Sequence, residues 1–383
     1  MKIALVRQSY HKYGGAERYV SYLAEELLKK GHEVHIFARK WDPNVPKEII
    51  FHRVPTLRGP SFLKALSFAY NVKRLLEEEK FDIINSFDRT LYQDIYRAGD
   101  GVHRKWRKRL LEITPNPLTR LSILLNPLHL SLLSLEKRIF EEGKYKKIIA
   151  ISKEGKEEII KYYGVRPEDI MVVYNGVDLE EFHPQNKALF REEIRKEFNI
   201  GNDEFLILFV GSGFRRKGLR YLIEAVSLLK EERPLKMLVV AKGKKRPYLR
   251  LARRLGIKDK IIFTGGRKDL RKFYATSDLF VLPTIYEPFG NVCLETLASG
   301  LPIIVSKTSG AAEIITEGEN GLLLKNPRDS QELAEKIRLT FDNRFRNKLA
   351  KNARTLAENF TVDKNVEKTL EVYRQAINNY NEQ

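Results

Sequence analysis

The chain has 383 residues, of which 43% are hydrophobic and 31% charged, with a net charge of +19 and one cysteine. This length exceeds what one hydrophobic core usually organises, and the hydrophobic fraction excludes an intrinsically disordered chain. The single cysteine, Cys293, excludes a disulfide framework and favours a reducing compartment. It lies between Val292 and Leu294, so we expect it to be buried rather than nucleophilic.

The excess of Lys and Arg indicates an anionic partner, and nucleic acid, anionic lipid and phosphorylated substrates all fit it. The structural alternative is a Lys- and Glu-rich surface of the thermophilic type. The sequence has no run of about 18 to 20 apolar residues. The four apolar residues after Lys2 are too few for the apolar core of a signal peptide. We therefore expect a cytosolic protein, or one bound to the inner face of a membrane.

The first half of the chain alternates short apolar runs with amphipathic stretches. In chain order, this pattern predicts strands at 3–6, 32–38, 81–85, 146–152 and 171–174, and helices at 16–30, 63–79 and 153–163. A second series follows, with strands at 205–210, 236–240, 261–263, 279–282 and 302–306, and a helix at 221–229.

The segment 178–202 is polar and contains Pro184, so we predict that it crosses between the two halves. The final stretch, 363–380, is predicted to be a helix, because four apolar residues share one of its faces. Alternation of strands and helices indicates parallel sheets in both halves. We predict two doubly wound, Rossmann-like α/β domains that face each other across a central cleft, where the carboxyl ends of the strands bind ligands.

The segment 287–295 carries the strongest functional signal. Glu287 follows the apolar run 278–283, and Glu295 lies eight residues further on, with seven residues between the two acids and about one turn into a predicted helix. The helix N-terminus between them favours phosphate. A carboxylate also accepts two hydroxyl hydrogen bonds and so suits a ribose diol. Two solvated acids are the structural alternative, but they do not explain Pro288 and Gly290 between them.

In each half of the chain, a glycine loop follows the first predicted strand. Gly14 and Gly15 open a helix, although the sequence there is not the G-x-G-x-x-G pattern of nicotinamide cofactor sites. The loop 210–218 presents Arg216 and Lys217 at a helix start, where fixed cations neutralise a diphosphate. A strand-to-helix turn and a solvated basic turn are the structural alternatives.

Two further loops are weaker candidates. The loop 264–270, which includes Arg267, could read the edge of a nucleotide base, and a surface turn explains it equally well. Asp100 lies between two glycines and could orient an acceptor hydroxyl or take its proton, as could His103. A turn aspartate is the alternative for Asp100.

A basic cluster precedes a leucine-rich stretch. The cluster contains Arg104, Lys105, Trp106, Arg107, Lys108 and Arg109, and residues 113–135 after it include a single Lys or Arg and no acid. Cations and Trp beside a leucine-rich helix are typical of proteins that bind an anionic membrane surface. Proline at 115, 117 and 127 divides the stretch into short pieces, so it is not predicted to span a membrane. RNA binding and a buried helical hairpin are the alternatives.

Several of these segments together resemble the retaining GT-B glycosyltransferases of family 4. The resemblance extends over nearly the whole chain, and it rests on the segments 14–18, 175–178, 216–217, 287–295 and 298–302. Within that family, the segments 10–15, 98–100 and 210–218 resemble the lipopolysaccharide core α-1,3-glucosyltransferases, as does the basic, leucine-rich region. The form Glu-Pro-Phe-Gly at 287–290 is instead that of family 4 in general.

The resemblance implies a nucleotide sugar, UDP-glucose in the first instance, bound mainly by a domain at 179–362. Glu295 would hold the ribose, Arg216 and Lys217 the diphosphate, and Glu287 the sugar. The other donor-binding residues would be Gly14, Gly15, Arg267, Phe289, Gly290 and Asn291. A domain at 1–178 would bind the acceptor and present Asp100, and the helix at 363–383 would cross back to it.

The resemblance further implies a retaining reaction with no metal and no cofactor. It implies a glycolipid acceptor of the lipopolysaccharide-core type, an anionic membrane as partner, and a position on the cytoplasmic face of the inner membrane. No nucleic acid is expected as a partner. Two alternatives stay open at this point. One is a mannosyl- or galactosyltransferase of the same family that acts on another lipid-linked or capsular acceptor. The other is a basic protein without catalytic activity that binds RNA or lipid.

Overall fold

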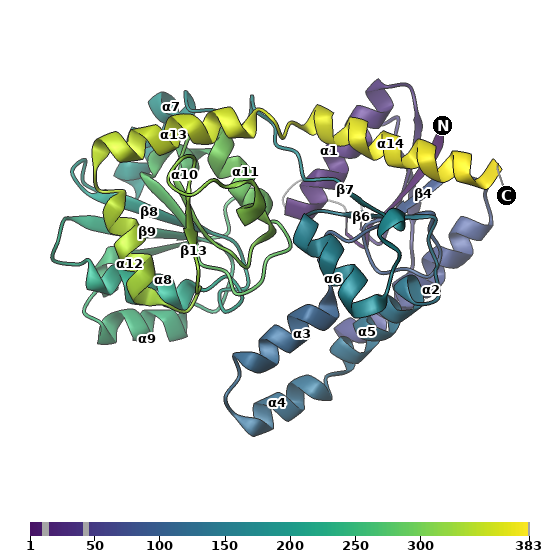
Figure 1. Cartoon of the computed structure of the whole chain (residues 1–383), viewed down its shortest axis with the longest axis horizontal. Helices are drawn as coiled ribbons and strands as arrows, with labels where there is room; N and C mark the ends of the chain where they lie inside the picture. The colour runs from purple at the N-terminus through teal and green to yellow at the C-terminus, as the bar shows by residue number, and fades with distance from the viewer. Residues whose placement is uncertain (10–14, 41–45, 382–383) are drawn as a thin grey trace. The chain divides into compact units, whose positions relative to one another are not determined.

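The computed structural model describes residues 1–9, 15–40 and 46–381, and its contacts divide the chain into two compact units (Figure 1). The first unit comprises Met1–Asn175 with Val362–Gln383, and the second comprises Gly176–Thr361. The boundaries predicted at 178 and 362 lie within three residues of these divisions.

The first unit is built on a seven-stranded parallel sheet in the order β3-β2-β1-β4-β5-β6-β7. Its strands are β1 Lys2–Val6, β2 Glu33–Ala38, β3 Ile50–Arg53, β4 Ile83–Ser86, β5 Ile95–Arg97, β6 Lys147–Ala150 and β7 Ile170–Val172. The central strands are buried along almost their whole length, whereas β3 at the sheet edge is partly exposed. Strands covered by helices on both faces have this continuous apolar character.

Helices cover both faces of this sheet. The helices of the first unit are α1 Gly15–Lys29, α2 Ser61–Glu77, α3 His103–Glu112, α4 Pro117–Leu124, α5 Pro127–Phe140, α6 Lys153–Tyr163 and α14 Val362–Asn381, with a 3₁₀ turn η1 at Pro167–Asp169. The last helix, α14, lies along α1, and Val366, Leu370 and Tyr373 join the same apolar core as β1 and β2 (Figure 1). The C-terminal segment therefore completes the first unit, although it follows the second in sequence.

Helices α3, α4 and α5 extend from the first sheet (Figure 1). Asn116 and Asn126 each cap the helix that follows them, with proline in the first turn, so the predicted breaks at Pro117 and Pro127 are helix starts. Within the described part of the chain, no individual helix has the length and apolarity to cross a membrane. The pair α4 and α5, bent by 46°, reaches that length and composition together.

The second unit is built on a six-stranded parallel sheet in the order β10-β9-β8-β11-β12-β13. Its strands are β8 Phe205–Val210, β9 Leu235–Val240, β10 Ile261–Gly265, β11 Leu279–Leu282, β12 Ile303–Ser306 and β13 Leu322–Leu324. The helices are α7 Asn186–Glu197, α8 Leu219–Leu228, α9 Arg246–Arg254, α10 Arg271–Thr276, α11 Asn291–Ala298, α12 Ser330–Leu339 and α13 Asn343–Ala357, with 3₁₀ turns η2 Lys258–Lys260 and η3 Gly310–Ile314.

One prediction about the second unit is wrong. The segment 178–202 is not a polar crossing, because it contains α7, which packs against α10 inside the second unit. Arg195 on α7 is buried and its guanidinium lies 3.0 Å from an Asp278 carboxylate oxygen just before β11. A buried ion pair therefore anchors a helix whose composition looks like that of a linker.

Candidate functional site

The second sheet changes direction between β8 and β11. From this point the chain adds β9 and β10 on one side and β12 and β13 on the other, so the loops after β8 and β11 diverge. In open parallel sheets, ligands bind at the carboxyl ends of the strands where the order reverses in this way. The loop after β8 carries Arg216 and Lys217, and the loop after β11 carries Glu287.

The structure brings these three side chains together. The Oε2 atom of Glu287 lies 3.0 Å from Nη1 of Arg216 and 2.9 Å from Nζ of Lys217. Glu287 and Lys217 are buried, with 8% and 7% of their surfaces exposed, while Arg216 is more accessible. Burial alone would raise the pKa of Glu287, but the charges of Lys217 and Arg216 outweigh it and the net shift is downward. Glu287 is therefore ionised at neutral pH, and the cluster keeps one positive charge in excess.

Close backbone contacts fix the two loops against each other. The Ile285 amide donates to the Arg216 carbonyl at 2.8 Å, and the Arg216 side chain donates to the Tyr286 carbonyl at 2.9 Å. Gly218 has a φ of +75°, and a Cβ at this position would lie 1.8 Å from the Pro283 carbonyl oxygen. Only glycine allows the two loops to approach this closely.

Helix α11 begins directly after this cluster. Its N-cap is Gly290, with a φ of +87°, and no side chain caps the helix. Phe289 before it is fully buried, and its carbonyl accepts a hydrogen bond from Ser309 Oγ at 3.2 Å. An uncapped helix N-terminus beside two cations is a suitable seat for a phosphate group. The predicted sequence of acid, helix start and acid is present, because Glu287 lies in the loop and Glu295 on the helix.

Glu295 points into a buried environment. It is 5% exposed, and its Oε2 accepts a hydrogen bond from the Tyr274 hydroxyl at 2.7 Å. Tyr274 lies on α10 and escaped the sequence analysis, because a tyrosine on a short apolar helix gives no signal of its own. Cys293 is fully buried, as predicted, and burial raises the pKa of its thiol.

One predicted donor-binding residue of the second unit, Arg267, lies outside this cluster. Arg267 follows β10 and forms an ion pair with Glu197 of α7 at 2.9 Å. Its guanidinium also lies over the Phe198 ring, 5.4 Å from the ring centroid. Gly15 is the first residue of α1 in the first unit, and Gly14 lies outside the described residues. The ion pair of Arg267 with Glu197 therefore connects the loop after β10 to α7.

Asp100 lies in the loop after β5 in the first unit, with 49% of its side chain exposed. Its Oδ2 is 3.9 Å from Nη1 of Arg89, a buried residue that the sequence analysis missed. Arg89 also donates to the fully buried Glu136 of α5 at 2.7 Å and to the Gly101 carbonyl at 3.0 Å. The ion pair of Arg89 with Glu136 is buried, and Arg89 in turn lies beside the accessible carboxylate of Asp100.

The residues after β1 and β4 complete this region. The first sheet also changes direction, between β1 and β4, and Arg7 and Asp88 follow these strands. Nη1 of Arg7 lies 3.3 Å from Oδ1 of Asp88, and burial raises the pKa of Asp88. The sequence shows that Arg7 and Asp88 each follow a short apolar run. It does not show that β1 and β4 are neighbours in the sheet, so the contact between the two residues could not be predicted.

His103 is a poor proton acceptor in this structure. It is 9% exposed, its Nε2 lies 2.8 Å from Nδ1 of His129, and burial lowers its pKa to about 3. A base with this pKa takes protons weakly at neutral pH. Of the two alternatives considered from the sequence, Asp100 is better suited to receive or orient a hydroxyl.

The predicted membrane residues lie on or beside α3, and several have intramolecular partners. Arg104 and Arg107 donate to the carbonyls of Tyr162 and Leu124. Lys105 and Arg109 pair with Glu158 at 3.1 Å and Glu112 at 3.0 Å. Trp106 is half-buried and Lys108 is exposed. The exposed apolar residues of this region are instead leucines of α4, α5 and their connection, namely Leu118, Leu121, Leu124, Leu125 and Leu130.

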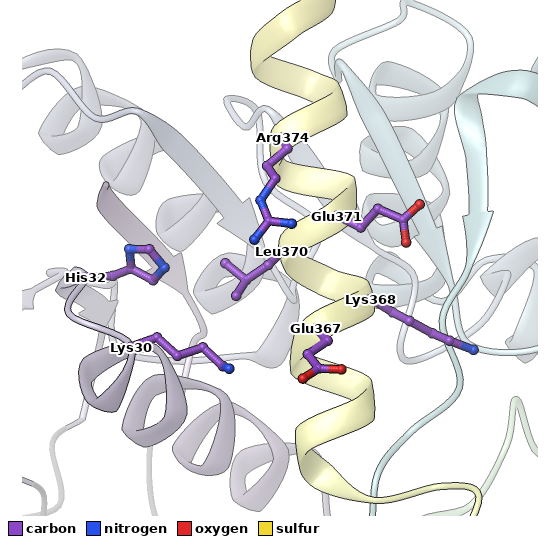
Figure 2. A pocket seen from close by; sticks show the side chains of 7 residues that line it. All are labelled: Lys30, His32, Glu367, Lys368, Leu370, Glu371 and Arg374. Atoms are coloured by element: carbon purple, nitrogen blue, oxygen red, sulfur yellow. The ribbon is translucent and has the colours of Figure 1, made fainter.

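A pocket of about 700 Å³ lies elsewhere in the first unit, beside α14. Figure 2 shows Lys30, His32 and Arg374 directed into it, while Lys368 and Glu371 extend from the other side of the helix. None of the predicted site residues lines it. Its lining residues follow α1 or lie on α14 and carry charges of both signs, so we interpret the pocket as a gap in the packing of α14 beside the end of α1.

Two family models match the sequence in succession. The model described as Glycosyltransferase Family 4 matches residues 13–181, and the model described as Glycosyl transferases group 1 matches residues 190–356. The first match covers most of the first unit, and the second covers the loops that carry Arg216, Lys217 and Glu287.

Relatives of similar length support these matches. An uncharacterised glycosyltransferase of Methanocaldococcus jannaschii is 29% identical over 98% of this chain and 99% of its own length. The lipopolysaccharide glucosyltransferase WaaG of Escherichia coli is 26% identical over 94% of each chain. A crystal structure of WaaG, a glycosyltransferase involved in lipopolysaccharide biosynthesis, superposes with a TM-score of 0.84 and 25% identity, covering 97% of this chain and 99% of that one.

Proposed function

Because the chain belongs to the GT-B glycosyltransferases of family 4, we propose that it is a retaining, metal-independent hexosyltransferase. Its donor would be a UDP-sugar, UDP-glucose in the first instance. Its acceptor would be a lipopolysaccharide-core or related glycan of the cell envelope, reached at the inner membrane face. The observation that carries the proposal is the cluster of Arg216, Lys217 and Glu287 at the switch point of the second sheet.

The diphosphate of the donor would bind Arg216 and Lys217. In the structure, these two cations share one carboxylate, so their donors are only partly used by Glu287. A diphosphate with two negative charges would more than offset this excess, and the backbone N–H groups at the N-terminus of α11 would stabilise the remaining negative charge. Burial of Lys217 strengthens this attraction, because charges interact more strongly where water is excluded.

The two carboxylates would hold the two ends of the donor. Glu287 sits at the phosphate seat, and we assign it to the hydroxyls of the transferred sugar. Glu295, oriented by the Tyr274 hydroxyl, is assigned to the ribose diol. Neither acid is given a role as proton donor, since Glu287 is kept ionised by the cations beside it.

In the proposed reaction, an acceptor hydroxyl oxygen bonds to the anomeric carbon on the face that the nucleotide leaves. The bond from that carbon to the phosphate oxygen breaks, and the departing phosphate takes the hydroxyl proton. Arg216 and Lys217 stabilise the negative charge that develops on it. Asp100 of the first unit, held by Arg89, would orient the acceptor hydroxyl.

A thermal-shift titration with UDP and a hydrolysis screen of nucleotide sugars test this assignment. UDP should raise the melting temperature of the native protein, and K217M should abolish the shift. The matched control is K336M, because Lys336 is also a poorly exposed lysine in an ion pair of the second unit, 2.7 Å from Glu317. Equal UDP shifts in K217M and the native protein would contradict the proposal. No response to UDP together with tight RNA binding would favour a nucleic-acid-binding protein.

Metal independence and retention have separate readouts. Transfer should proceed unchanged in excess EDTA, and a rate that falls with EDTA and returns with Mg²⁺ would refute metal independence. With UDP-glucose as donor, the glycosidic product should have the α configuration of the donor. A β-configured product, measured by the coupling constant of the anomeric proton, would refute retention.

For the membrane contact, we propose that the exposed leucines of α4 and of the turn after it insert while the cations of α3 attract the anionic surface. Leu118, Leu121 and Leu125 are 77%, 51% and 64% exposed, beside a strongly basic helix. Exposed apolar side chains with nearby Lys and Arg favour the headgroup region of a bilayer.

Vesicle co-sedimentation tests this contact. With vesicles of phosphatidylcholine and phosphatidylglycerol, substitution of the three leucines by glutamine should abolish binding. L189Q is the control, because Leu189 is 68% exposed but lies on α7 of the second unit. Unchanged sedimentation of the triple variant would overturn the assignment.

A further inference from the structure

Two histidines and two glutamates gather at the edge of the first sheet, and none of them is assigned to the transfer reaction. His35 lies on β2, His52 on the edge strand β3, and Glu79 follows α2. One ligand atom from each of these three lies within 4.8 Å of the others. Glu33, the first residue of β2, contacts Nε2 of His35, the ring nitrogen that does not face His52.

The hydrogen bonds of His35 determine where its lone pair points. Its Nε2 lies 2.7 Å from a carboxylate oxygen of Glu33, so this nitrogen carries the proton and donates. The lone pair is then on Nδ1, which lies 2.7 Å from Nε2 of His52 and 3.9 Å from Oε2 of Glu79. A carboxylate that binds one ring nitrogen of a histidine while the other faces a second set of ligands is typical of metal centres.

Aromatic rings hold both imidazoles in place. His52 stacks on Phe37, with ring centroids 4.3 Å apart and planes 5° from parallel. Phe81 packs edge-on against His35 at 5.0 Å. His35 is 3% exposed, whereas Glu79 keeps 37% of its side chain accessible, so the cluster is rigid on one side and open to solvent on the other. Ligands fixed in this way lose little freedom when they bind an ion.

The charges around the imidazoles favour a cation. Glu33 and Glu79 contribute two negative charges, and Lys2, 2.5 Å from Glu79 and 3.7 Å from Glu33, supplies one positive charge. These three charged side chains therefore carry a net charge of −1 beside the two imidazoles.

We propose that His35, His52 and Glu79 bind a divalent transition metal ion of the zinc class, with Glu33 positioning His35. Two imidazole nitrogens and one carboxylate oxygen are ligands that Zn²⁺ accepts, and the open side leaves its fourth position to water. His52 would shift its proton to Nδ1 so that Nε2 binds the ion.

The geometry requires only small movements. Tetrahedral coordination at zinc–nitrogen distances of about 2.0 to 2.1 Å separates neighbouring ligand atoms by roughly 3.3 Å. The two imidazole nitrogens, now 2.7 Å apart, would separate slightly, and Glu79 would approach His35 by a comparable amount from 3.9 Å. The ion would join β2, β3 and the end of α2 to one another.

The site has no part in the proposed transfer. Lys2 and Glu33 begin β1 and β2, so the cluster lies toward the amino ends of these strands, whereas Asp100 follows a carboxyl end. Its expected effect is on the stability of the sheet edge, which can be measured without any sugar substrate.

Isothermal titration of the full-length, metal-stripped protein with Zn²⁺ tests the proposal, with Co²⁺ as a spectroscopic probe. We expect one saturable site, a higher melting temperature with Zn²⁺, and Co²⁺ absorption bands of four- or five-coordinate geometry. H52Q should weaken binding at least tenfold, and E33Q by about 10- to 100-fold, the usual effect of removing such a supporting carboxylate. Binding should also weaken as the pH falls and the imidazoles protonate.

Two variants separate a metal site from a hydrogen-bonded histidine pair. H129Q is the control, because His129 also forms a close imidazole pair, 2.8 Å from His103, and should leave zinc binding unchanged. K2M should strengthen binding, since it removes the cation that now competes for Glu79. The proposal fails if no saturable binding occurs at millimolar zinc, if H52Q binds like the native protein, or if H129Q weakens binding as much as H52Q.

Discussion

Replacing Glu287 by glutamine should separate the electrostatic role of this residue from its role in holding the sugar. The substitution keeps the size of the side chain but removes the charge that Lys217 and Arg216 share. Lys217 is buried, so E287Q leaves a cation without its counter-charge in a site that water reaches poorly. The E287Q variant should therefore be less stable than the native protein in the absence of substrate.

The size of this loss follows from the distances. Opposite charges about 3 Å apart attract by roughly 5 to 6 kcal/mol at an effective dielectric constant of about 20, and desolvation offsets part of that. Removal of one partner from a buried pair costs about 3 to 5 kcal/mol in measured cases. Arg216 is 29% exposed and is stabilised by water, which favours the lower end. We expect a loss of about 3 kcal/mol, measured by urea denaturation.

The pH dependence has a defined sign. The folded pKa of Glu287 is depressed below its ordinary value of 4.5, so its contribution to stability is present above that pH. This contribution is lost as the pH falls through the folded pKa. The difference in unfolding free energy between the native protein and E287Q should therefore be constant from pH 7 to 5. It should shrink below about pH 4.5.

UDP supplies the decisive comparison. In E287Q the two cations no longer share a carboxylate, so UDP should bind at least as tightly as in the native protein, while hexose transfer is lost. The double variant K217M/E287Q should recover much of the lost stability, because it removes the unpaired charge. If E287Q is as stable as the native protein within about 0.5 kcal/mol, the three charges are not coupled as the structure indicates. Loss of UDP binding in E287Q would instead indicate that Glu287 maintains the conformation of the loop after β11.

Three further outcomes follow from single residues. G218A should destabilise the second unit by about 3 kcal/mol or more, from a left-handed backbone and the contact with Pro283. G318A, at a φ of +74° with nothing within 4 Å, should lose only about 1 to 2 kcal/mol, and equal losses in urea denaturation would refute the packing argument. E136Q should cost about 3 to 5 kcal/mol, because the buried Arg89 loses its partner, whereas E112Q at the exposed pair with Arg109 should cost less than about 1 kcal/mol. Cys293 should resist a thiol reagent at pH 8 in the folded protein and react once unfolded, and rapid labelling of the native state would show that it is accessible.

The sequence predicted the elements of the candidate site better than their partners. Glu287 was expected after a strand and Arg216 with Lys217 after another, and each lies there. That the three side chains meet depends on β8 and β11 being neighbours in the sheet, which hydrophobic periodicity does not reveal. For the same reason the pair of Arg89 and Glu136, 47 residues apart, could not be anticipated.

Errors in the predicted fold have a common physical origin. Helix α7 is rich in charge and its exposed Leu189 weakens the apolar pattern, so the segment resembled a linker. Its position is fixed by the contact of Arg195 with Asp278, a long-range ion pair invisible to local patterns. The edge strand β3 is short and partly exposed, and it too was absent from the predicted elements. Local patterns failed where tertiary contacts, rather than a continuous apolar face, stabilise an element.

The structure also determines how much net charge the basic cluster of α3 would bring to the proposed membrane contact. Lys105 and Arg109 are neutralised by glutamates, whereas Arg104 and Arg107 bind carbonyl oxygens and so keep their full charge. With Lys108, three net positive charges remain to attract anionic lipid. Such attraction between exposed charges is screened beyond about 8 Å at physiological ionic strength. Insertion of Leu118, Leu121 and Leu125 depends on buried apolar area instead, so these leucines should sustain vesicle binding at salt concentrations that abolish the electrostatic attraction.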